Sequence, residues 1–390
     1  MQHEKDQAFR DTATRRFGKK SKWTLLIASF VLALLFAELV LRTVWHNPYQ
    51  HDGPDRVVKL RMQHARTHHR IDRSAIHPDK PNTLLRTDSR SYLLPSFQYE
   101  QPDCTIVFLE GSTTECCAVD EATRFPALVS TTLAERDLHV NTLNAGTSGN
   151  TLHDSINVYF NHALQDKPDI VVLMHACNDV GVLVRGEGYR SREGAFLTWP
   201  LLANSWLKNL TNHSYVLAIM RQTLREHTHF FPEEPEEKLL ASDAASPKLD
   251  GEYEKRLRTF VRMCHATGAK PVVMTQPTSG CVSELTPDWI DTTVQMRFND
   301  LVRRVGAEED AMVVDLVKHL EDEVPNWREP MNIFYDGVHV TDRGSTLYGR
   351  HITESLLPLV RSIVNKSAEE KDQKAFGTMA NAKSELERSR

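Results

Sequence analysis

A serine and an aspartate–histidine pair are the residues of this chain best suited to do chemistry. Ser112 follows Gly111 directly after an apolar run, in Phe108-Leu-Glu-Gly-Ser-Thr-Thr-Glu115. A Gly–Ser pair at a strand-to-helix turn exposes its hydroxyl, and the backbone N–H groups that follow suit a developing oxyanion. Near the C-terminus, Asp336-Gly-Val-His339 places an acid and a base three residues apart. A turn can direct such a histidine to a nucleophile while the aspartate sets its tautomer.

Two further segments carry polar groups after apolar runs. In Asn144-Ala-Gly-Thr-Ser-Gly149, the final glycine would let a backbone N–H approach a ligand closely. In His175-Ala-Cys-Asn178, the asparagine amide can donate a hydrogen bond into the same crevice. The four segments together predict a nucleophile, its base and acid, and hydrogen-bond donors for an oxyanion.

The elements that must position these residues alternate between short apolar runs and amphipathic stretches. Buried parallel strands are continuous apolar runs, and their alternation with helices is typical of a doubly wound sheet. The predicted strands are Thr105–Leu109, Val140–Leu143, Ile170–Met174, Pro271–Thr275 and Met312–Leu316. The predicted helices are 121–136, 151–165, 250–267, 291–306 and 342–364. We therefore expect a flavodoxin-like three-layer α/β/α domain with a five-stranded parallel sheet, whose site lies beyond the carboxyl ends of the strands.

In order and position, the four segments resemble the conserved blocks of the SGNH/GDSL hydrolases, from about Cys104 to Val364. The resemblance implies that Ser112 is the nucleophile and that Asp336 and His339 complete its triad. It also implies an oxyanion hole formed by the Ser112 N–H, the Gly149 N–H and the Asn178 amide. There are two departures: the usual Gly-Asp-Ser is Glu-Gly-Ser here, and the usual glycine before Asn-Asp is a cysteine.

The resemblance implies a serine esterase that works through an acyl-enzyme, with no metal and no cofactor. A histidine base must be neutral, so activity should fall below roughly pH 6–6.5. The substrate we expect is a small acylated compound or an acylated glycan at the cell surface. A lipid esterase or thioesterase, an acyltransferase, and a non-catalytic glycan-binding or assembly protein on the same fold are the alternatives.

The N-terminal region predicts a membrane anchor. An apolar run from Trp23 to Leu41 would form a helix roughly 28 Å long, close to the ~30 Å hydrocarbon core. Its one acid, Glu38, lies four residues before Arg42, on the same helical face. Basic residues precede the run, which favours a cytoplasmic N-terminus and a domain that is periplasmic, extracellular or lumenal. A cleaved signal peptide and a buried core helix are the alternatives.

We expect the chain to be divided into a basic cytoplasmic tail (1–22), a signal-anchor helix (23–43), a stem (44–103), a hydrolase domain (104–365) and a disordered tail (366–390). Residues 180–249 form a long insertion, which is either a lid or a helical pair packed on the sheet edge.

Composition excludes several classes of protein. The net charge of −5 gives no indication of nucleic-acid binding. Six scattered cysteines without a CxxC pair argue against a disulfide-rich mini-fold and a thiolate zinc site. Cys177 is expected to pack inward, whereas the sequence leaves the pairing of Cys116 and Cys117 open. The histidines at 64, 68, 69 and 77 are expected to form a solvated basic face, not a metal site.

Overall fold

The computed structural model of the chain contains two compact units. One unit comprises Met1–Val57 and Glu193–Glu237, and the other comprises Val58–Arg192 and Lys238–Arg390. The structure describes residues 2–45, 60–185, 189, 213–227, 247–279, 292–329 and 331–388. The four motif segments all belong to the second unit.

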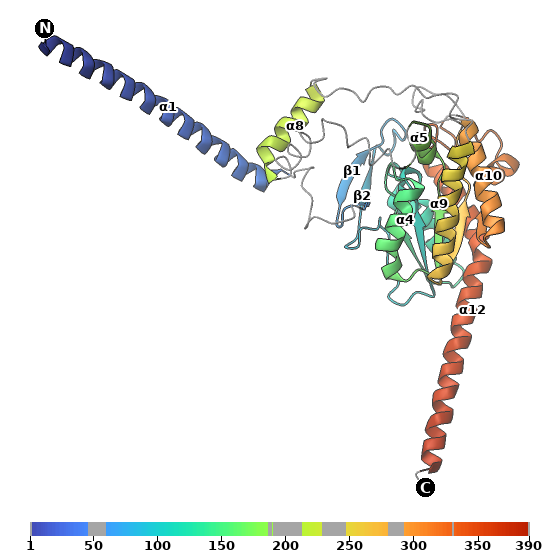
Figure 1. Cartoon of the computed structure of the whole chain (residues 1–390). Coiled ribbons are helices and arrows are strands. Elements are labelled where there is room, and N and C mark those ends of the chain that lie inside the picture. The colour runs from blue at the N-terminus through green and yellow to red at the C-terminus, as the bar shows by residue number, and fades with distance from the viewer. Residues whose placement is uncertain are drawn as a thin grey trace. The chain divides into compact units, whose positions relative to one another are not determined.

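The second unit is built on a parallel sheet (Figure 1). Its strands are β3 (Cys104–Leu109), β4 (Val140–Asn144), β5 (Ile170–Met174), β6 (Lys270–Met274) and β7 (Met312–Val314). They lie in the order β4-β3-β5-β6-β7, and every neighbouring pair is parallel. The strands agree with the predicted runs to within two residues, so the expectation of a five-stranded parallel sheet is confirmed.

Each face of this sheet is covered by helices. Alternate residues of β3 point to opposite faces: Val107 and Leu109 belong to one buried cluster, and Ile106 and Phe108 to the other. The first cluster contains side chains of α4 (Leu152–Asn161), α5 (Cys177–Arg185), α9 (Pro247–Ala266) and α10 (Thr292–Glu308). The second contains side chains of α3 (Phe125–Ala134), α11 (Leu316–Glu323) and α12 (Asp342–Arg388). The domain therefore has three layers, as the sequence predicts.

Short elements join the main ones. The one-turn helix α2 (Ser112–Glu115) follows β3, and the 3₁₀ helices η1 (Glu121–Thr123) and η2 (Ala163–Asp166) follow α2 and α4. Thr151 and Asp154 form a capping box at the start of α4. This cap fixes the helix directly after the Gly149 loop.

The segment expected to be a stem is instead part of the folded unit. β1 (His68–Asp72) pairs antiparallel with β2 (Asn82–Arg86). Tyr92 and Leu93 are completely buried, and the Leu93 N–H donates to the Asn144 carbonyl at 2.9 Å. A domain boundary at residue 104 is therefore wrong, because the preceding segment supplies core side chains and a hydrogen bond to β4.

Two other expectations differ from the structure. Helix α12 continues to Arg388 through the region expected to be disordered. Its last part is rich in Ala, Glu and Lys, which have high intrinsic helix propensity. Residues 180–185 belong to α5, and α8 (Tyr215–His227) lies within the insertion. Tyr189, the two residues before α8 and the first residues of α9 are the other described parts of the 180–249 insertion, and the remainder lies outside the described residues.

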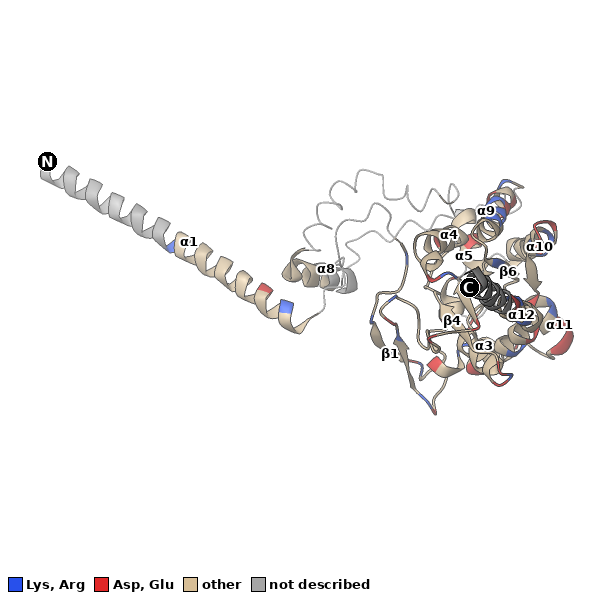
Figure 2. Ribbon diagram, turned by 90° about the horizontal axis from the view of Figure 1, so that it is seen from below, with Lys and Arg blue, Asp and Glu red and all other residues tan. Residues whose placement is uncertain are grey.

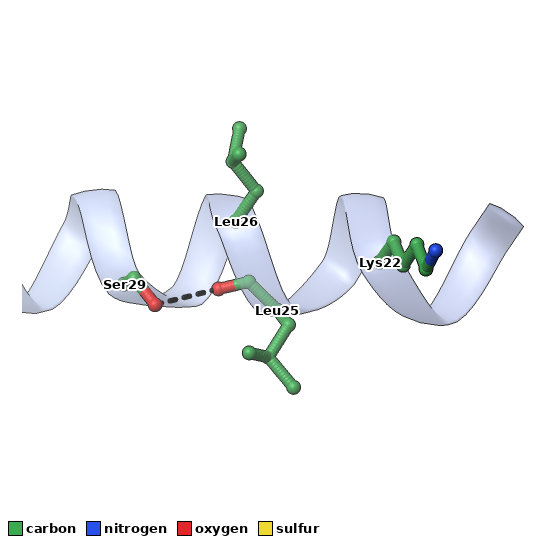
Figure 3. Close-up of a pocket in the computed structure, with 4 residues that line it drawn as sticks. All are labelled: Lys22, Leu25, Leu26 and Ser29. Carbon is green, nitrogen blue, oxygen red and sulfur yellow. Dashed lines mark hydrogen bonds between the residues drawn. The ribbon is translucent and has the colours of Figure 1, made fainter. Parts of the chain in front are cut away.

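The first unit contains α1 (Gln2–Val44) and α8. Lys22–Val44 is long and apolar enough to cross a membrane, and none of its most apolar window is buried. Glu38 and Arg42 are the charged residues between Lys22 and Val44 (Figure 2). The Ser29 hydroxyl donates to the Leu25 carbonyl at 2.9 Å (Figure 3), so this polar group is satisfied within the helix.

Candidate active site

Ser112 lies at the carboxyl end of the central strand β3. It is the first residue of α2, and its side chain is half-buried. Parallel strands end at a common edge of the sheet, so the loops after β4 and β5 lie near the same point. The strand-to-helix turn therefore presents the hydroxyl where the sequence predicts it.

The structure brings Ser112 together with His339 and Asp336. The His339 Nε2 and Ser112 Oγ are 2.7 Å apart, and the His339 Nδ1 and an Asp336 carboxylate oxygen are 2.6 Å apart. The other carboxylate oxygen accepts the N–H groups of Val338 and His339 at 2.8 and 2.7 Å. The imidazole is thus held between a carboxylate and a hydroxyl, as general-base activation of a serine requires.

The electrostatic environment keeps Asp336 ionised. Burial alone would raise its pKa, but the hydrogen bonds and charge of His339 and the Val338 N–H lower the pKa below its usual value. An ionised Asp336 accepts a hydrogen bond from Nδ1, which leaves Nε2 as the acceptor for the serine proton.

A tight loop before α12 holds the acid and the base. The Tyr335 N–H donates to the His339 carbonyl at 3.0 Å, and the Tyr335 ring stacks on the imidazole with centroids 5.6 Å apart. Gly344 allows the start of α12 to approach closely, since a Cβ there would lie 2.2 Å from the Ile333 carbonyl oxygen. Asp336 and His339 therefore lie on one closed turn, and the start of α12 packs against the residues just before that turn.

The other residues expected to form the oxyanion hole follow the two neighbouring strands, Gly149 in the loop after β4 and Asn178 at the start of α5. Gly149, after β4, has a φ of 74°, which favours glycine. Asn178 lies in the first turn of α5, and its amide nitrogen donates to the Asn150 carbonyl at 2.8 Å. A Cβ on Gly111 would lie 2.3 Å from that same nitrogen. The Asn178 amide is therefore next to the residue that precedes Ser112.

In this arrangement, position 111, where the usual motif has Asp, has room only for glycine. A side chain at position 111 would collide with Asn178, whereas Glu110 is buried and points elsewhere. The Glu110 carboxylate accepts hydrogen bonds from the Thr113 hydroxyl, the Thr114 N–H and, at 3.0 Å, the Gln276 amide. It therefore ties α2 to the loop after β6.

A strap at residues 61–63 holds the Gly149 loop, and nothing in the sequence pointed to it. The Arg61 guanidinium donates to the carbonyls of Ser148 and Gly149 at 3.0 and 3.1 Å. The Asn150 amide donates back to the Arg61 carbonyl at 2.9 Å. Arg61 thereby holds the peptide group between Ser148 and Gly149, whose N–H is the one expected to face an oxyanion.

Glu115 joins the strap to α2. It accepts hydrogen bonds from the Gln63 amide at 2.8 Å and from the Ser148 hydroxyl. Burial raises the pKa of this carboxyl, although the Ser148 and Gln63 hydrogen bonds act in the opposite direction. The available sequence signal was its position at the end of Gly-Ser-Thr-Thr-Glu.

Asp179 holds the first turn of α5, which carries Asn178. It is fully buried, accepts the Leu152 N–H at 3.0 Å and the Tyr189 hydroxyl, and its carboxylate lies 3.4 Å from the His175 Nδ1. It therefore connects the start of α5 to the start of α4.

Within the described part of the chain, no thiol belongs to the Ser112–His339–Asp336 arrangement. Cys177 is buried, and burial raises the pKa of its thiol well above the usual range. The five cysteines that the structure describes are free, including Cys116 and Cys117, while Cys281 lies outside the described residues. Within the described ranges, no group of three or more His, Cys, Asp or Glu could hold a metal ion.

Comparisons with solved structures show distant likenesses. LAE5, an alpha/beta hydrolase enzyme from the metagenome of Lake Arreo, Spain, is 18% identical with a TM-score of 0.39, over 67% of this chain and 96% of its own. The acetyl xylan esterase AlAXEase is 15% identical with a TM-score of 0.41, over 65% and 99%. The lipase/acylhydrolase from Enterococcus faecalis is 18% identical with a TM-score of 0.42, over 65% and 95%. Among curated proteins, no relative matches the chain.

A family-level match covers the site. The model of the GDSL-like Lipase/Acylhydrolase family matches residues 110–347, more than half of the 390 residues. The matched segment runs from the residues just before Ser112 to those just after His339. The chain therefore belongs to the GDSL-like lipase/acylhydrolase family and is a carboxylic-ester hydrolase.

Proposed function

We propose that this protein is a membrane-anchored serine hydrolase that removes an O-acyl group from a glycan at the cell surface. The observation that carries the catalytic part is the pair of short contacts from His339 to Ser112 and to Asp336. The glycan as substrate rests on the proposed position of the domain outside the cytoplasm.

The proposed reaction proceeds through an acyl-enzyme. His339 takes the Ser112 proton as the hydroxyl oxygen attacks the ester carbonyl, and then protonates the leaving alcohol. Water repeats the cycle and releases the acid, with His339 again as the base. Asp336 orients the imidazole and stabilises its protonated form.

The oxyanion is proposed to accept hydrogen bonds from the Ser112 N–H, the Gly149 N–H and the Asn178 amide. Loss of one such donor typically lowers kcat about 10²–10³-fold. The proximity of the Asn178 amide to Gly111 supports its assignment to this site.

Membrane anchoring is proposed from the apolar helix Lys22–Val44. The basic residues before it favour a cytoplasmic N-terminus. Protease added to spheroplasts should then degrade the C-terminal domain and leave a protected N-terminal fragment. Full protection of the domain would contradict this orientation.

The catalytic proposal is tested by labelling with a fluorophosphonate. The wild-type protein should be labelled and Ser112→Ala should not, whereas Ser362→Ala, a change of an exposed serine in α12, should label normally. Labelling that survives Ser112→Ala would exclude Ser112 as the nucleophile. Faster hydrolysis of nitrophenyl acetate than of nitrophenyl octanoate is expected for an O-acetyl esterase, and the reverse order would favour a lipid esterase.

A further inference from the structure

Glu38, the acid inside the apolar segment of α1, accepts hydrogen bonds from the start of α8, from the residue before it and from Arg42. One Glu38 carboxylate oxygen accepts the Tyr215 N–H at 3.0 Å, and the other accepts the Val216 N–H at 3.1 Å and the Ser214 hydroxyl at 3.0 Å. Arg42 adds a hydrogen bond from Nε at 3.1 Å. All of these residues belong to the same compact unit.

These contacts fasten the N-terminus of α8 to α1. The first N–H groups of a helix have no partner within the helix and carry a partial positive charge, which a carboxylate satisfies. An acid without a partner is costly in the middle of a bilayer, so acids within membrane-spanning segments are normally paired. Glu38 therefore has a structural reason to lie in an apolar helix, because it caps another helix.

The attachment point lies near the end of the apolar segment. Glu38 is six residues before Val44, or about 9 Å along the helix axis. Beside it, the Trp45 and Tyr215 rings meet edge to face at 6.0 Å, and the Arg42 guanidinium lies 5.4 Å from the Tyr215 ring centroid. Tryptophan, tyrosine and arginine are typical of the boundary between hydrocarbon and water.

From this point α8 leads off across the axis of α1 and not along it (Figure 1). A helix that crosses a membrane-spanning helix at the level of the boundary lies in the plane of the membrane surface. Its first two turns are Tyr-Val-Leu-Ala-Ile-Met. Met220 is 53% exposed, and Val216, Leu217 and Ile219 are partly exposed, so apolar surface remains uncovered.

We propose that α8 is an interfacial helix, whose apolar first turns lie between the lipid headgroups and the acyl chains of the membrane that α1 crosses. Lipid is the occupant that fits, because the exposed apolar surface is continuous with that of the proposed anchor and begins at its aromatic boundary. The inference rests on the membrane anchoring proposed above. The proposed anchor then consists of two helices, α1 and α8, which are joined through Glu38.

The test places an environment-sensitive fluorophore on Met220→Cys of the full chain in phosphatidylcholine–phosphatidylglycerol liposomes. The matched control is Thr259→Cys, an exposed position on α9, and the parent protein gives the background from native thiols. A nitroxide attached to lipid near the headgroup should quench the probe at 220 several-fold more than the probe at 259. Equal quenching at the two positions, or a probe at 220 that is shielded from water but not quenched, would overturn the proposal.

Glu38→Leu tests whether the hydrogen bonds of Glu38 hold α8 in place. Loss of the cap should reduce the quenching at position 220 several-fold, whereas Leu32→Ala, a change elsewhere in the apolar segment, should not. Unchanged quenching in Glu38→Leu would refute the role of Glu38. Recovery of the protein in carbonate-washed membranes is scored separately: a soluble chain refutes the anchoring, and an anchored chain without quenching refutes only the position of α8.

Discussion

Substitution of Gly111 by alanine should lower kcat strongly, because the added methyl group would displace the Asn178 amide. The added Cβ would lie 2.3 Å from the Asn178 amide nitrogen and 3.1 Å from the Asn150 carbonyl oxygen. The φ of Gly111 is −91°, outside the left-handed region, and the expected effect is that of the contact with Asn178. The amide nitrogen must move away to make room.

The size of the effect follows from that movement. An ordinary contact to a Cβ begins at 3.4 Å, so the amide must shift by about 1 Å. A shift of this size removes the proposed oxyanion donor, which corresponds to about 10²–10³ in kcat, or about 2.7–4 kcal/mol. It also breaks the hydrogen bond from Asn178 to the Asn150 carbonyl, at a cost of about 1 kcal/mol in the free energy of unfolding.

A double-mutant cycle on nitrophenyl acetate checks the reasoning. Gly111→Ala and Asn178→Ala should each lower kcat to a similar extent, and the double variant should be little worse than Asn178→Ala alone, because the colliding amide is gone. A coupling energy near the full single-variant effect is expected. Full activity of Gly111→Ala, or effects that multiply in the double variant, would refute the assignment.

Four more perturbations test the surroundings of the site. Arg61→Ala should lower kcat by up to about 10²-fold with little change in KM, because the Gly149 loop loses the hydrogen bonds from the guanidinium. An unchanged kcat would show that the loop keeps its conformation without Arg61. Asp336→Asn should lower kcat by about 10⁴-fold in steady-state assays, since the imidazole loses its acceptor, and a small loss would argue against the triad. The pKa of Glu115 is raised in the folded state, so the wild-type protein loses stability as the pH rises above the pKa of the unfolded chain. In urea titrations, Glu115→Gln should therefore become more stable relative to wild type from pH 4.5 towards neutrality. A chain of residues 104–365 should fail to melt cooperatively, whereas one of residues 58–365 should melt normally in calorimetry, because the segment before 104 fills the core.

Much of the site was predictable from sequence because its residues follow strands. Carboxyl ends of parallel strands meet at one edge of the sheet, so polar residues placed after β3, β4 and β5 must converge. The Asp336–His339 spacing is local and describes a single turn. The strands themselves were evident as continuous apolar runs, because both of their faces are covered.

The segment before β3 was misjudged for a related reason. Its strands β1 and β2 carry His, Arg and Asp, and they lack the apolar periodicity that marks a buried element. Leu93 contacts β4 through the Asn144 carbonyl, and the Tyr92 hydroxyl donates to Asp166, 74 positions away. No local pattern indicates contacts over such separations.

The sheet, the order of the motif segments and a helix long enough to cross a membrane could all be predicted from the sequence, since each depends on periodicity or local spacing. The partners that support Gly149 and satisfy Glu38 are evident only in the folded structure. Arg61 and Gly149 are 88 positions apart, and Glu38 and Tyr215 are 177 apart. Such contacts form when two surfaces fit in space, so the residue types alone do not specify them.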